Sequence, residues 1–158
     1  MPSDRRQAAG VRANLEALLA GAARDLALAV TANLTEACPV DTGHARRNFI
    51  PSVGAPVTEA DDGAGQAAGQ AAVLSYRIGD GPLFVTNNVP YIDRLVLGSS
   101  TQAPAGWDLV AVDAAVQEVQ QRYAGMRIDV TSSIDVSARG AGAAAGIAAA
   151  YSPFGGDE

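Results

Sequence analysis

Cys38 and His44 are the single cysteine and the single histidine of the chain, and they lie close enough in sequence to offer a thiol and a base. Cys38 stands directly before a proline, where a helical pattern must end, and no third group is placed to orient the imidazole. We therefore expect no catalytic residues, with a small enzyme that uses His44 as a distant alternative.

The other candidate chemical groups lack the spacing that their chemistry requires. The acidic pairs Asp61-Asp62 and Asp157-Glu158 lie among glycines without the ligand pattern of a calcium loop. Gly79-Asp80-Gly81 is not followed by the glycine and lysine of a phosphate-binding loop. We expect no metal site and no cofactor.

A turn-forming segment, Pro39 to Arg47, separates a long helical pattern from an extended one. Pro39 ends the helix, Asp41 or Thr42 can cap a new turn, and Gly43 supplies backbone freedom. Such a corner would direct Arg46 and Arg47 outward. Two interpretations stay open: a cationic corner that docks onto a partner, or a capped connection whose arginines are simply solvated.

Composition limits the classes of protein that fit. The 158 residues suffice for one domain, and a content of 48% apolar but only 5% aromatic residues predicts a modest core of Ala, Val and Leu. A net charge of −6 and the absence of lysine disfavour broad nucleic-acid binding, although DNA could pass nearby. The lone cysteine, with no signal peptide and no apolar run of membrane length, indicates a protein made and kept in a reducing cytoplasm.

The spacing of apolar residues predicts an α+β fold in one domain, residues 1–136. A long N-terminal helix carries a stripe with steps of three or four, and residues 48–57 follow as an edge strand. Residues 61–72 contain almost no large side chain and are expected to form a mobile loop. The stripe comprises Val11, Leu15, Leu18, Ala22, Leu26, Val30 and Leu34.

Alternating patterns over 72–78 and 83–89, joined by an Asp-Gly turn, predict a β-hairpin. A short helix over 91–97 closed by Gly98, a helix from about residue 104 to Tyr123, and a last strand within 126–136 complete the domain. The expected sheet is small and mostly antiparallel, with about four strands.

Residues 137–158 are rich in glycine and alanine and are expected to form a flexible arm. Tyr151 and Phe154 near its end could anchor the arm on another subunit, or they could simply be exposed.

Three segments, in this order, carry a resemblance to a known family: Pro39 to Gly43 followed by Arg46; Thr86 to Tyr91 leading into Leu95 to Gly98; and Ser99 to Gly106. Together they resemble the neck or tail-completion family of long-tailed, lambda-like bacteriophages, a minor tail component of the head-tail junction. The chain departs from the family pattern at Val96, where an acidic residue is usual, and in its C-terminal arm.

The resemblance implies a structural virion protein without enzymatic activity, which assembles as a homo-oligomeric ring between the head connector (its stopper or adaptor proteins) and the tail terminator or tail-tube proteins. A gene transfer agent is equally compatible, and a tail terminator is the nearest alternative. The expected interface residues are Asp41, Thr42, Gly43, Arg46, Arg47, Asn87, Asn88, Tyr91, Tyr151 and Phe154.

Overall fold

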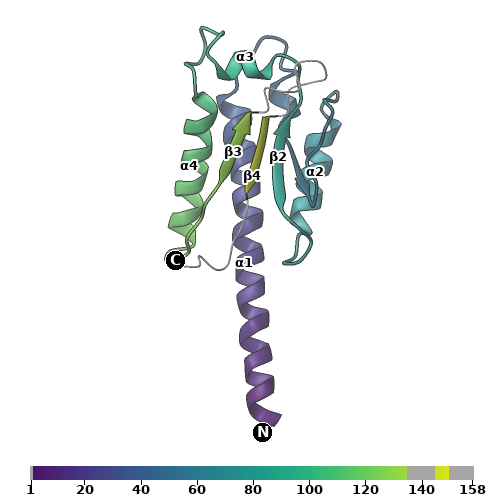
Figure 1. Cartoon of the computed structure of the whole chain (residues 1–158), viewed down its shortest axis with the longest axis vertical. Helices are drawn as coiled ribbons and strands as arrows, with labels where there is room; N and C mark the ends of the chain where they lie inside the picture. The colour runs from purple at the N-terminus through teal and green to yellow at the C-terminus, as the bar shows by residue number, and fades with distance from the viewer. Residues whose placement is uncertain (1, 135–144, 150–158) are drawn as a thin grey trace.

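The computed structural model describes the backbone of residues 2–134 and 145–149 and the side chains of residues 4–130. The fold is α+β, as predicted, and begins with a long helix (Figure 1). The elements are α1 (Pro2–Ala37), η1 (Arg46–Asn48), β1 (Ile50–Val53), α2 (Ala64–Leu74), β2 (Leu83–Asn87), α3 (Ile92–Val96), α4 (Trp107–Arg122), β3 (Thr131–Ile134) and β4 (Ala145–Ala149).

Helix α1 is amphipathic, and its C-terminal half forms the centre of the core. Leu26, Val30 and Leu34 are buried together with the inner face of α4, which presents Ala115 and Val119. The N-terminal half of α1 extends beyond the rest of the domain (Figure 1). The predicted stripe is therefore confirmed as a core face only in the second half of the helix.

The sheet is built on the antiparallel pair β1 and β2, in which Ile50 lies opposite Thr86 and Val53 opposite Leu83. The backbones of β3 and β4 continue the ladder in the order β1-β2-β4-β3. Within residues 4–130, where side chains are also described, the sheet consists of β1 and β2, two strands, whereas about four were expected. One expected strand is absent there because the residues before Ser75 belong to α2, and the predicted hairpin is wrong for the same reason.

Helix α2 replaces the mobile loop that the sequence predicted over residues 61–72. Asp61 precedes the helix and stabilises its start, since its carboxylate accepts the backbone N–H groups of Gly63 at 2.6 Å and Gly65 at 2.5 Å. A Cβ atom added at Gly69 would overlap the carbonyl oxygen of Pro51, so the helix lies directly against β1. The shortage of large side chains, which suggested disorder, is what permits this close contact.

Helices α3 and α4 confirm their predictions within a few residues. Gly98 ends α3 with a φ of 88°, and its N–H donates to the carbonyl of Leu95 at 3.1 Å. The buried face of α4 includes Ala111, Val112, Ala115 and Val119, whereas Leu109 is exposed. The small side chains of Ala111 and Ala115 let α4 approach α1 closely.

Two aromatic side chains join the core to the segments around it. The rings of Phe49 and Trp107 meet edge to face, with centroids 6.2 Å apart and an angle of 87°. The indole N–H of Trp107 donates to the carbonyl of Leu95 at 3.0 Å. The end of α3 and the start of α4 are thereby fixed to each other and to the strand that follows the corner.

Candidate functional site

The corner, which we define as residues 39–45, begins where α1 ends, as the proline predicted. The hydroxyl of Thr42 accepts the N–H of His44 at 3.4 Å in a local turn, and Gly43 takes a φ of 79°. The N–H of Arg47 then donates to the carbonyl of Gly43 at 3.2 Å and leads into η1. Neither of the two expected capping residues caps η1, whose N-cap is Ala45 without a side-chain hydrogen bond.

Arg46 does not point outward, so this part of the prediction is wrong. Its guanidinium turns back to the end of α1 and donates to the carbonyls of Glu36 and Cys38, both at 3.1 Å. These carbonyls lie at a helix terminus, where no further turn supplies donors. Arg47 is exposed, and the stem of its side chain lies beside Gly63. Of the two arginines, only Arg47 is exposed.

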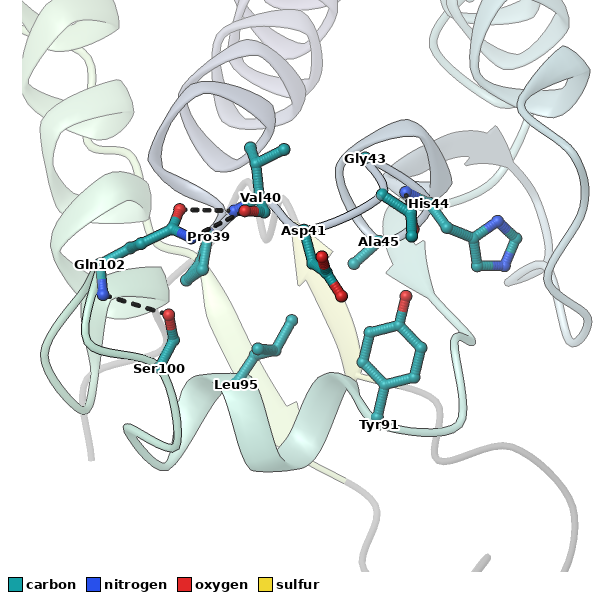
Figure 2. Close-up of a pocket in the computed structure, with 11 residues that line it drawn as sticks. Pro39, Val40, Asp41, Gly43, His44, Ala45, Tyr91, Leu95, Ser100 and Gln102 are labelled. Carbon is teal, nitrogen blue, oxygen red and sulfur yellow. Dashed lines mark hydrogen bonds between the residues drawn. The ribbon is translucent and has the colours of Figure 1, made fainter.

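Gln102 ties the loop after α3 to the corner. Its side-chain oxygen accepts the N–H of Val40 at 2.9 Å, and its nitrogen donates to the carbonyl of Val40 at 2.7 Å (Figure 2). The N–H of Gln102 donates to the hydroxyl of Ser100 at 3.1 Å, which orders the loop around it. Gln102 has no recognisable signal in the sequence, because a glutamine in a loop does not indicate a partner far away in the chain.

Asn87 and Asn88 are buried, which contradicts their expected role as direct interface residues. Asn87 donates to the carbonyl of Ala45 at 2.8 Å and accepts the N–H of Val89 at 3.2 Å. Asn88 donates to the carbonyl of Val57 at 2.7 Å, while its oxygen is buried without a partner among the described residues. Asn87 therefore holds the corner in place, and Asn88 holds the segment that contains Val57, so neither side chain presents a surface.

Asn48 is a second structural residue that sequence reasoning missed. It donates to the carbonyls of His44 at 2.9 Å and Asp61 at 3.1 Å, and it accepts the N–H of Asp61 at 2.8 Å. Asn48 therefore connects the corner to the start of α2. In the sequence Asn48 follows two arginines, whose charges are the stronger signal, but it is the side-chain amide of Asn48 that makes the contacts.

The corner borders an open pocket of about 280 Å³. The carboxylate of Asp41 and the hydroxyl end of Tyr91 point toward each other across it, with the side chain of Leu95 beside them, while the imidazole of His44 points away (Figure 2). The pocket is lined by Pro39, Val40, Asp41, Thr42, Gly43, His44, Ala45, Tyr91, Leu95, Ser100 and Gln102. A carboxylate beside apolar and aromatic surface can accept a donor or cationic side chain from a partner.

Cys38 is in a poor environment for nucleophilic chemistry. Burial raises the pKa of its thiol to about 11, and the nearby positive charge of Arg46 offsets this only in part. The thiol lies 3.5 Å from the carbonyl oxygen of Pro39 and is protonated at neutral pH. The structure thus gives no support to a pair formed by Cys38 and His44.

Within the part of the chain that the structure describes, no group of three or more potential metal ligands is present. No helix in that part is long and apolar enough to cross a membrane. Tyr151 and Phe154 lie outside the described residues.

Comparisons with protein-family models, with curated proteins and with solved structures gave no match.

Proposed function

We propose that this chain is a structural virion protein of the head-tail junction, a neck or tail-completion component that assembles as a ring between the head connector and the tail tube of a bacteriophage or gene transfer agent. The observation that carries the proposal is that three distant segments meet around one pocket. These are residues 39–45 of the corner, Tyr91 with Leu95, and Ser100 with Gln102. They are the same segments that resemble the neck family.

The corner is suited to docking because its shape is fixed before any partner arrives. Gln102 holds Val40 by two hydrogen bonds, and the side chain of Asn87 donates one to the carbonyl of Ala45. A preordered surface loses little conformational entropy on binding. In a ring, each subunit repeats the contact, and after the first one forms, the others are effectively intramolecular. A chain with few large exposed anchors can therefore form a firm joint.

Deletion of the gene, followed by supply of the full chain in trans, tests the proposal. Without the protein, we expect filled heads and finished tails that stay separate in electron micrographs, with joining restored by the wild-type chain. The double variant Asp41→Ala, Tyr91→Ala should restore few joined particles because the pocket loses its carboxylate and its ring. Asp62→Ala removes an exposed carboxylate outside the pocket and is the matched control.

Each outcome has a distinct meaning. Normal joining in the deletion strain contradicts a function at the junction, and tails of irregular length in that strain identify the tail terminator instead. His44→Ala is expected to restore joining fully, and its failure to do so would favour a chemical role for the imidazole. Full rescue by the pocket variant would place the docking surface elsewhere on the protein.

A further inference from the structure

The N-terminal half of α1 carries an apolar surface that the described part of the chain leaves uncovered. No side chain from residue 4 to residue 19 is buried, and the first buried residue of the helix is Ala20. Val11, Leu15 and Leu18 are 68%, 53% and 51% exposed. Steps of four and three residues place these side chains on one face of the helix. We call them the projecting stripe.

The projecting stripe continues, without a change of face, into the buried stripe that contains Ala22 and Leu26. The face that forms the core in one half of α1 is therefore open in the other half (Figure 1). A helical segment of this length is marginal in water by itself, and Gly10 weakens it by a further ~1 kcal/mol relative to alanine. A partner that covers the stripe would stabilise this half of the helix.

A second exposed apolar surface lies where α3 ends and α4 begins. Leu97, Leu109 and Val110 are 71%, 56% and 70% exposed. The two helix ends are joined because the N–H of Gly106 donates to the carbonyl of Val96 at 2.9 Å. Asp113, one turn further along α4, adds an exposed carboxylate. This surface, the α3–α4 face, lies at the end of the molecule away from the N-terminus (Figure 1).

The charges of the chain are divided between the two regions. The projecting segment, residues 2–19, contains Arg5, Arg6 and Arg12 against Asp4 and Glu16, a net charge of +1, whereas the rest of the chain carries −7. Two projecting segments would bring like net charges together. The α3–α4 face carries the carboxylates of Asp93 and Asp113 beside one exposed arginine, Arg94. A projecting segment laid on that face of another copy therefore meets opposite net charge, which favours that arrangement.

We propose that the projecting stripe of one copy binds the α3–α4 face of the next copy. Val11, Leu15 and Leu18 would cover Leu97, Leu109 and Val110, and the arginines of the projecting segment would approach Asp113. This contact joins two different surfaces, and such head-to-tail contacts generate closed rings when the rotation between copies closes. The inference rests on the ring assembly in the proposed function and identifies the surfaces that form the ring.

Disulfide cross-linking of the full-length chain tests the contact directly. Leu15→Cys and Val110→Cys are made in separate chains, which are mixed and mildly oxidised. We expect a cross-linked dimer from the mixture and none from either variant alone. Ala13→Cys, on the opposite side of the helix, replaces Leu15→Cys in the control mixture and should give little product. Wild-type Cys38 is buried and stays out of the reaction.

Three results would overturn the proposal. Self-linking of Leu15→Cys would show that two projecting segments pair with each other. Equal yields from Leu15→Cys and Ala13→Cys would show random collision. A wild-type chain that stays monomeric in sedimentation at the highest soluble concentration would show that the surfaces do not bind.

A matched pair of charge variants measures the strength of the contact. Leu15→Glu is expected to weaken self-association by about tenfold or more because it places a charge in the apolar contact. Ala13→Glu adds the same charge on the opposite side and should change the association constant by less than about twofold. Both positions are exposed, so the fold is retained. Equal effects of the two variants would contradict the proposed surface.

These results are separable from a failure of the proposed function. A ring that forms without the cross-link between positions 15 and 110 leaves the role at the junction intact and refutes only this contact. If the cross-link between positions 15 and 110 forms specifically, but deletion of the gene does not affect the joining of heads and tails, the contact is supported and the function at the junction is refuted.

Discussion

At the residue scale, polar side chains hold the corner together through hydrogen bonds to the backbone. Gln102, Asn87 and Asn48 each satisfy backbone groups of the corner or its surroundings, and Arg46 satisfies the end of α1. Exposed side chains of the corner, such as Asp41, make few hydrogen bonds to the described part of the chain. Stability and docking should therefore depend on different residues of the same short segment.

Arg46→Ala and Arg47→Ala are a matched pair that tests this separation. Arg46→Ala removes two hydrogen bonds to the carbonyls of Glu36 and Cys38 and should lower the free energy of unfolding by about 1–2 kcal/mol. Arg47→Ala removes an exposed side chain and should stay within about 0.5 kcal/mol of the wild type. Urea titration measures both. Equal losses would indicate that Arg46 does not hold the end of α1.

The raised pKa of the buried Cys38 thiol predicts that the folded protein loses stability at alkaline pH. Its thiol pKa rises from 9.0 to about 11 on folding, so the folded chain holds this proton more tightly than the unfolded chain does. The resulting stabilisation is complete below the unfolded pKa and is lost as the pH rises toward the folded pKa. Thermal melts should show a steeper decline between these values for the wild type than for Cys38→Ala. Parallel declines would contradict burial of the thiol.

At the element scale, α2 shows how small residues create a contact. Its glycines allow the helix backbone to lie against β1, and Asp61 fixes its start. The projecting half of α1 is the opposite case, since large apolar side chains there have no cover among the described residues. Side-chain size alone therefore does not report whether a helix is packed.

Gly69→Ala and Gly10→Ala compare one substitution in two helices. A methyl group at Gly69 would overlap the carbonyl oxygen of Pro51, so we expect a loss of about 1–3 kcal/mol despite the better helix propensity of alanine. At Gly10 the added Cβ has nothing within 4 Å. That variant should gain helicity by circular dichroism, with up to about 1 kcal/mol of stabilisation. A stabilised Gly69→Ala would show that α2 is not pressed against β1.

At the scale of the whole molecule, the N-terminal half of α1 and strand β4 differ in how they contact the rest of the domain. The N-terminal half of α1 extends from it, whereas β4, which lies in the segment expected as an arm, pairs with β2 and β3. Leu83 pairs with Ala149, and Asn87 pairs with Ala145. Strand β4 thus brings a late, alanine-rich segment to the edge of the central pair.

Two truncations test the contribution of β4. A chain that ends at Ile134 loses β4, and β2 then keeps only β1 as a neighbour, so its free energy of unfolding should fall by about 2 kcal/mol or more. A chain that ends at Ala149 keeps the strand and should unfold like the full chain. Thermal unfolding of both chains measures the difference. Equal midpoints would place β4 outside the cooperative unit.

The sequence by itself determined the local features of this protein. The long helix, its end before Pro39, the short helix closed by Gly98 and the last helix follow from hydrophobic periodicity and from residues with restricted or unusually free backbones. Such signals act between neighbours in the chain, so they can be read without the fold.

Only the tertiary structure decided the contacts between distant segments. Residues 64–74 fold as a helix because β1 offers a surface that glycines can approach. Arg46 turns inward because the end of α1 lies within its reach, and Gln102 reaches Val40 across 62 positions of the chain. These outcomes depend on a neighbour that the chain brings close only when it folds, and no local pattern specifies which neighbour that is.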